Sequence, residues 1–83
     1  MELEIISPEK KIYFGEAESV TLPGVEGLFS ILDHHAPLIS VLKAGKISYK
    51  KADHTIVDLD VDGGFVEVNN NRVIICVENE TER

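Results

Sequence analysis

The segment Thr55-Ile56-Val57-Asp58-Leu59-Asp60-Val61-Asp62 decides the fold, because apolar and acidic residues alternate along most of its length. Successive residues of an extended chain point to opposite sides, so its valines and leucine share one face and its aspartates the other. The segment therefore predicts a β-strand with one buried face and one solvated acidic face. The glycines that follow, Gly63-Gly64, can adopt the positive φ of a tight turn, which predicts a hairpin with Phe65 to Val68.

Short apolar runs separated by turn residues extend over the rest of the chain, and no segment shows a helical period. Leu38 to Leu42 is a nearly continuous apolar run, typical of a strand that is covered on both sides. Arg72 to Val77 predicts a last buried strand, and the polar stretch from Glu78 to Arg83 predicts a frayed end. Further strands are expected at Leu3 to Ile5, Ile12 to Phe14, Val20 to Leu22, Leu28 to Leu32 and Ile47 to Tyr49. About eight to ten short strands with frequent turns predict an all-β sandwich or barrel, a single domain over residues 1–83.

Composition places the chain among small acidic globular proteins. Its 83 residues are 43% hydrophobic and 28% charged, and 15 acidic against 8 basic residues give a formal charge of −7. This charge opposes binding to nucleic acid or anionic lipid, so neither partner is expected. No apolar run approaches the roughly 20 residues that cross a bilayer, and the acidic start is unlike a signal or transit peptide. We therefore expect a cytosol-like compartment, which the single Cys76 also suits.

The acidic row Asp58, Asp60 and Asp62, with the glycine after it, matches the first half of an EF-hand calcium loop. The twelfth loop position holds Asn69 in place of the bidentate glutamate, and strands are expected where the motif requires helices. A half-buried strand with a wet acidic face is therefore favoured over a calcium site. Lysines on a neighbouring strand are expected to relieve the repulsion within the row. The candidates are Lys46, Lys50 and Lys51.

The corner Asp33-His34-His35, with His54 as a distant partner, is the second candidate for metal binding. Zinc needs three or four convergent ligands, and adjacent residues of an extended chain point apart, so a surface corner with one hydrogen-bonded histidine is favoured. Cys76 lies in an apolar run and is expected to be a small buried hydrophobe. The sequence shows no nucleophile with an obvious base and no phosphate-binding loop. No catalytic residue, cofactor or metal is therefore predicted.

Several turn and strand motifs occur in the order in which one known family has them. They are Ser7-Pro8-Glu9, Pro23-Gly24-Val25-Glu26-Gly27 with Phe29-Ser30-Ile31-Leu32, His35-Ala36-Pro37-Leu38, Lys43-Ala44-Gly45, and Gly63-Gly64-Phe65-Val66-Glu67-Val68. Each motif is weak alone, but their order and spacing resemble the epsilon subunit of bacterial F-type ATP synthases, called delta in mitochondria. The resemblance covers nearly the whole chain, with Ala44 in place of the proline of the family's usual proline-glycine turn.

The resemblance implies a flattened ten-stranded β-sandwich that is a non-catalytic rotor subunit of the central stalk. Such a subunit links the gamma subunit to the polar loops of the c-ring, and so couples proton-driven rotation to ATP synthesis at the cytoplasmic face of the bacterial plasma membrane. The family's ring contact carries over to Glu26, Gly27, Leu28 and His35, with Leu28 at a position that is often charged in relatives. The gamma contact is expected at Ser7 and along Leu38, Ile39, Ser40, Val41 and Leu42.

Most members of this family continue into a two-helix hairpin that can restrain ATP hydrolysis. The present sequence ends at Arg83 before any helical segment, so we expect assembly and coupling without an inhibitory arm. A second hypothesis stays open at this point. It is a free-standing metal- or ligand-binding β-sandwich that uses the acidic row or the histidine corner.

Overall fold

The computed structural model describes residues 1–82, which form short strands joined by turns. The strands of this region are β1 (Glu2–Ile6), β2 (Lys11–Gly24), β3 (Gly27–Leu32), β4 (Leu38–Leu42), β5 (Gly45–Lys51), β6 (Ile56–Val61), β7 (Gly64–Asn69), β8 (Arg72–Val77) and β9 (Glu80–Glu82). The predicted all-β class is confirmed, with nine strands among the described residues in place of the ten that the resemblance implies. Among the same residues, no helix is long and apolar enough to cross a membrane.

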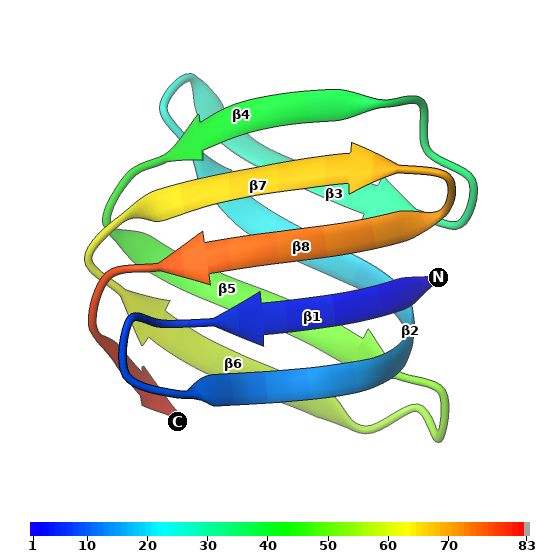
Figure 1. Ribbon diagram of the computed structural model, residues 1–83, viewed down its shortest axis with the longest axis horizontal. Coiled ribbons are helices and arrows are strands. Elements are labelled where there is room, and N and C mark those ends of the chain that lie inside the picture. The colour runs from blue at the N-terminus through cyan, green and yellow to red at the C-terminus, as the bar shows by residue number, and fades with distance from the viewer. Residues whose placement is uncertain (83) are drawn as a thin grey trace.

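The strands form two layers that share one long strand (Figure 1). The first sheet has the order β4, β7, β8, β1 and the first half of β2, with β1 parallel to β8 and the other neighbours antiparallel. The second sheet has the order β3, the second half of β2, β5, β6 and β9, all antiparallel. Because β2 belongs to both sheets, it closes one side of the sandwich.

β2 accounts for part of the difference in strand number. The sequence predicts separate strands at Ile12 to Phe14 and Val20 to Leu22, but a single strand of 14 residues runs from Lys11 to Gly24. Its partner changes from β1 to β5 near Ala17, and its register with β5 shifts between Ala17 and Ser19. Such an irregularity bends a strand and increases its twist, which lets one strand serve both sheets.

The space between the sheets is filled by the apolar residues of the alternating strands. On β6, Leu59 and Val61 are buried while Asp58 and Asp60 lie on the outer side, as the sequence predicts. No polar or charged residue among residues 1–81 is buried, so the hydrophobic effect supplies the driving force for this core. The largest fully buried side chains are Leu3, Ile5, Val20, Leu22, Ile31, Ile47, Leu59, Val66, Val68, Val73 and Ile75.

Gly63 and Gly64 carry the chain from one sheet to the other. The predicted hairpin of Phe65 to Val68 with the preceding strand is wrong, because β6 pairs with β5 and β9 whereas β7 pairs with β4 and β8. Both glycines have a positive φ, 147° and 151°. A Cβ atom on Gly64 would lie 2.1 Å from the carbonyl oxygen of Cys76. The need for glycine is therefore confirmed, but it serves a corner between layers.

The predicted frayed end is also corrected. Glu80–Glu82 forms β9, which pairs with β6, while Arg83 lies outside the described residues. Two polar contacts accompany this strand, an ion pair of 3.2 Å between Lys10 Nζ and Glu80 Oε1 and a hydrogen bond of 3.0 Å from Asn79 Nδ2 to Asp62 Oδ2. The polar composition of the segment predicted a frayed end, but it is equally typical of an edge strand, because edge strands commonly carry charged side chains.

Candidate functional site

The outer surface of the first sheet carries a continuous apolar row. Cross-strand partners share a face of the sheet, and the partner pairs are Val41 with Phe65, Phe65 with Cys76, and Cys76 with Ile6. A second row beside it contains Ile39 and Ile74, each paired with Glu67. Six apolar side chains therefore make one surface, which we call the docking face: Ile6, Ile39, Val41, Phe65, Ile74 and Cys76.

The docking face is accessible at its β4 and β7 side. The exposed fractions are 75% for Ile39, 61% for Val41 and 47% for Phe65, which is high for large apolar side chains. Ile6, Ile74 and Cys76 are half-buried. Large contiguous apolar patches are uncommon on monomeric proteins, and they commonly mark interaction or ligand-binding surfaces.

Charges border the docking face on its β1 side. The Glu4 carboxylate lies 3.4 Å from Lys11 Nζ and 4.0 Å from Arg72 Nη2, and Arg72 Nε lies 2.7 Å from Glu2 Oε1. The acidic groups of β1 are thus balanced by bases within the same sheet. Glu67 is the acidic residue that stands among the apolar side chains of β4 and β8, and it is exposed.

Cys76 lies half-buried on the outer side of β8 and not in the core, which corrects the expectation of a buried cysteine. β8 buries Val73, Ile75 and Val77, whereas Ile74 and Cys76 point to the outer side. A groove of about 310 Å³ passes over Cys76 and Phe65 to the turn at Ser7 and Pro8. Partial burial raises the pKa of the Cys76 thiol, with Glu4 and Glu67 acting in the same direction. The thiol is therefore protonated and weakly nucleophilic at neutral pH.

The outer surface of the second sheet is mostly polar, although Leu28, Leu32 and Ile56 are exposed on it. Lys46 Nζ lies 3.7 Å from Asp58 Oδ2, and Lys50 Nζ lies 3.6 Å from Glu18 Oε1, so a lysine does relieve the acidic row as predicted. The hydroxyls of Thr21 and Ser30 share a hydrogen bond of 2.8 Å on this side. Among the described residues, no group of three or more His, Cys, Asp or Glu side chains is arranged to hold a metal ion.

The residues predicted to meet the c-ring lie at two separate places. Glu26, Gly27 and Leu28 form the tip of the β2–β3 hairpin, where Gly27 has a φ of 133° and Leu28 is 74% exposed. His35 follows the other end of β3, in the loop that leads to β4. The structure therefore brings the first three residues together and places His35 a strand length away from them.

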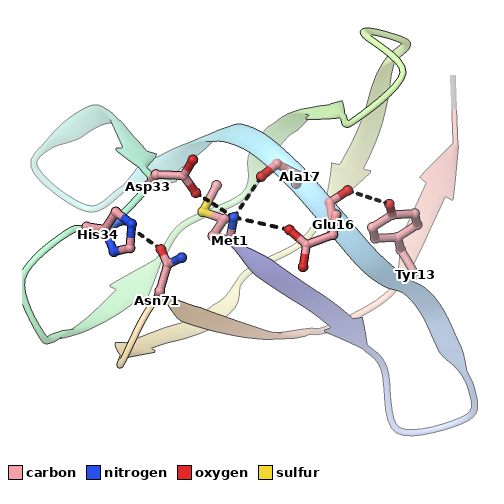
Figure 2. A network of polar contacts seen from close by, with 7 residues as sticks. All are labelled: Met1, Tyr13, Glu16, Ala17, Asp33, His34 and Asn71. Atoms are coloured by element: carbon pink, nitrogen blue, oxygen red, sulfur yellow. Dashed lines mark hydrogen bonds and ion pairs between the residues drawn. The ribbon is translucent and has the colours of Figure 1, made fainter.

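The loop that contains His35 is held by a network of polar contacts at the N-terminus (Figure 2). The Met1 ammonium donates to the Asp33 carboxylate and to the carbonyl oxygen of Ala17, the latter at 3.2 Å. The backbone N–H of His34 donates to Asn71 Oδ1 at 2.7 Å, which ties the loop to the β7–β8 turn. His35 Nδ1 contacts the Ala36 carbonyl oxygen at 2.7 Å. The ammonium holds the pKa of Asp33 below its usual range, and Asp33 in turn raises the pKa of the ammonium.

The residues predicted to meet gamma divide between the two sides of β4. Ile39 and Val41 belong to the docking face, whereas Leu42 is buried and Leu38 packs partly against the core, so β4 is not covered on both sides in this chain. Ser40 lines a groove below the β2–β3 hairpin. Ser7 lies beside the docking face, across the groove from Phe65. The sequence analysis did not place Ile6, Phe65, Ile74 or Cys76 on this surface, although the alternation of Phe65 and Glu67 with the two valines of β7 could have revealed Phe65.

The fold and its outer surfaces define a small β-sandwich with an apolar core and an exposed apolar surface on one of its two sheets. The family of the ATP synthase delta/epsilon chain, beta-sandwich domain, matches residues 1–82, and the chain belongs to this family. The family contributes a non-catalytic subunit to the central stalk of the F-type ATP synthase. The resemblance read from the sequence is thereby confirmed.

Curated relatives and solved structures agree with this assignment. The chain is 41% identical to the ATP synthase epsilon chain of Chlorobium limicola over 76 residues, which are 92% of this chain and 86% of that one. It is 46% identical to that of Sulfurimonas denitrificans over 78 residues, 94% of this chain and 60% of that one. The fold matches a chain in the structure of the Euglena gracilis mitochondrial ATP synthase, OSCP/F1/c-ring, with a TM-score of 0.91 and 20% identity, covering 96% of this chain and 51% of that chain.

A second solved structure, the central stalk and c-ring of the Tetrahymena thermophila mitochondrial ATP synthase, contains a chain with the same fold. The TM-score is 0.82 and the identity 21%, over 96% of this chain and 64% of that chain. The chain thus spans about half to two thirds of the longer proteins that it matches, but most of the Chlorobium relative. In that relative, the β-sandwich makes up nearly the whole protein.

Proposed function

We propose that this chain couples ring rotation to the catalytic subunits by holding the gamma subunit with its docking face and the c-ring loops with its β2–β3 hairpin. The observation that carries the proposal is the apolar row Val41–Phe65–Cys76–Ile6, which crosses four strands on one side of the sandwich. A two-sheet body with one apolar surface suits the transmission of torque, because this role requires a stiff body and a surface for attachment. It requires neither a cavity nor a catalytic group. This role places the chain at the cytoplasmic face of the bacterial plasma membrane as a peripheral subunit.

The proposed gamma contact follows from the chemistry of the docking face. Covering apolar surface yields roughly 25 cal/mol per Å², so the three well-exposed side chains Ile39, Val41 and Phe65 supply most of the favourable energy. Glu67 lies among them, and a basic group of gamma opposite this carboxylate would fix the register of the complex. Ser7 at the end of the groove marks one limit of the contact.

The proposed ring contact rests on the shape and exposure of the β2–β3 hairpin. Val25 and Glu26 form a two-residue turn between Gly24 and Gly27, so the tip is narrow enough to approach polar loops. Leu28, where relatives often carry a charge, makes this tip more apolar and the contact less dependent on salt. His35 lies at the other end of β3 and would take part only if the ring surface extends along that strand.

The test is association of the purified chain with recombinant gamma, measured by size-exclusion chromatography with light scattering. We expect a one-to-one complex that Val41→Glu abolishes, because the new carboxylate would be buried without a partner. Ala52→Glu is the matched control, since it adds the same charge in the exposed β5–β6 loop, away from the docking face. A wild-type chain that stays free beside folded gamma at micromolar concentrations, or equal loss in both variants, would overturn the proposal.

A further inference from the structure

One edge of β3 is left without a partner strand. β3 pairs with β2 over its whole length, and no other described strand pairs with it. Pro23 has no N–H, and its carbonyl oxygen accepts from Lys43 N at 2.9 Å, away from β3. The pair Pro23–Leu28 is therefore a non-hydrogen-bonded pair of the antiparallel ladder. Because such pairs alternate with hydrogen-bonded ones, the N–H and C=O groups of Leu28, Ser30 and Leu32 point to the free edge.

This edge lacks the features that keep exposed edges of monomeric proteins from pairing. The six residues Gly27–Leu32 contain no charge and no proline, and their ladder with β2 runs without a register shift. Leu28 and Leu32 are 74% and 60% exposed on the outer side, one on each side of Ser30. β4 is also uncharged, but its free edge is partly occupied, since Leu42 pairs with Gly24 of β2.

We propose that β3 pairs with β3 of a second copy of this chain, antiparallel and centred on Ser30. In this register each Ser30 faces its counterpart, and each Leu28 faces Leu32 of the partner subunit. The outward N–H and C=O groups of the two strands then lie opposite each other, and the exposed leucines cover one another. The strand Leu-Phe-Ser-Ile-Leu has nearly the same pattern in both directions, which the two-fold axis of such a contact requires.

The contact is small, so the dimer is weak. Pairing of two six-residue edges falls below the roughly 1,200 Å² of stable complexes, and the formal charge of −7 on each chain opposes it. In this register, the Leu28 N–H would donate to the Leu32 carbonyl oxygen of the second copy. That oxygen already accepts from His35 N at 3.2 Å within its own chain, so the N–H groups of Ser30 and Leu32 are the main donors across the contact. We expect a dissociation constant on the order of 0.1 mM, with tighter association as salt screens the charge.

Self-association and the proposed binding of gamma use different parts of the chain. The dimer covers Leu28 at the hairpin, which the proposed function assigns to the c-ring, and leaves the docking face on the other sheet free. The dimer therefore shields the hairpin strand of the unassembled subunit, while gamma can still bind. Failure of gamma binding would leave the dimer unaffected, so the two proposals are separately testable.

Sedimentation equilibrium of the isolated chain, from about 10 μM to about 1 mM, tests the dimer. The wild-type mass should rise toward twice that of the monomer, and Ser30→Ala should behave alike, since both keep the backbone N–H. Ser30→Pro should stay monomeric, because proline removes an N–H that points to the free edge and is not used in the ladder with β2. Both substitutions remove the hydrogen bond between the Thr21 and Ser30 hydroxyls, so the alanine variant is a matched control.

A charge pair tests the register. Ser30→Lys and Ser30→Glu should each be monomeric, because like charges would stand directly opposite each other, and an equimolar mixture should associate again. Circular dichroism confirms that each variant is folded. The proposal is wrong if the wild type stays monomeric at about 1 mM, if Ser30→Pro associates as the wild type does, or if the mixture fails to associate. Pairing of this edge with a segment of gamma, but not with itself, would also refute the second copy as its occupant.

Discussion

Phe65→Ala measures how much the docking face contributes to binding of gamma. A phenylalanine side chain offers about 150–250 Å² of surface, and Phe65 is 47% exposed, so about 70–120 Å² remain for a partner to cover. At roughly 25 cal/mol per Å² this area is worth about 2–3 kcal/mol, of which alanine retains a small part. We therefore expect a loss of about 2 kcal/mol, equivalent to a dissociation constant about 30-fold higher.

Isothermal titration calorimetry of each variant into gamma gives the constants, with Phe14→Ala as the matched control. Phe14 is 52% exposed on the same sheet, with Lys11 Nζ 5.1 Å from its ring centroid, but Glu4 separates it from the docking face. We expect its replacement to change binding less than about threefold, within the range of surface substitutions. An equal loss for both phenylalanines, or no loss for Phe65→Ala, would refute the placement of gamma on β4, β7 and β8.

Three further predictions concern the corner between the sheets, the thiol and the N-terminal network. Gly64→Ala should lower the free energy of unfolding by about 3 kcal/mol or more in urea melts, because the new Cβ combines a positive φ with a clash against the Cys76 carbonyl. Alkylation of Cys76 by iodoacetamide should accelerate up to and beyond pH 9.0, the ordinary thiol value, and bound gamma should block it; a rate that levels off near neutral pH would contradict the raised pKa. The stability that Asp33→Asn removes should be constant between about pH 5 and 7. It should shrink as the pH falls through the lowered pKa of Asp33, below 3.8, and again as the pH rises through the raised pKa of the Met1 ammonium, above 8.0; a pH-independent difference in melting temperature would contradict the ion pair.

The sequence was sufficient to predict the fold class and the positions of most strands, although two predicted strands are parts of β2 and β9 was expected as a frayed end. Alternation on β6 reports burial directly, since one face meets the core and the other meets water, and the aspartates lie outside as predicted. The hairpin tip at Glu26, Gly27 and Leu28 also lies where its turn residues indicate. These features are local, because each depends on the backbone preferences of a few neighbouring residues.

Features that depend on which strands pair with one another could not be predicted from the sequence. A hairpin turn and a corner between sheets can both require the positive φ that Gly63 and Gly64 adopt. Only the pairing partners of β6 and β7 show that these glycines form a corner and not a hairpin. The apolar runs of β4 and β8 have the composition of strands covered on both sides, yet Ile39, Val41 and Cys76 lie on an outer face. A partner protein in place of a second layer explains such a run equally well, and composition cannot separate the two.

The outer surfaces of the two sheets differ in their side chains, and β2 is part of both sheets. Its first half pairs with β1, whose partner β8 supplies the half-buried Ile74 and Cys76 of the docking face. Its second half pairs with β3 and β5, where serines, lysines and the opposing aspartates make the outer side polar. One long strand therefore joins the sheet with the exposed apolar docking face to the sheet with the mostly polar outer surface, and it ends at the hairpin tip. In the proposed function, a load applied at that tip would reach the docking face through continuous hydrogen-bonded ladders, with no flexible joint between the two contacts.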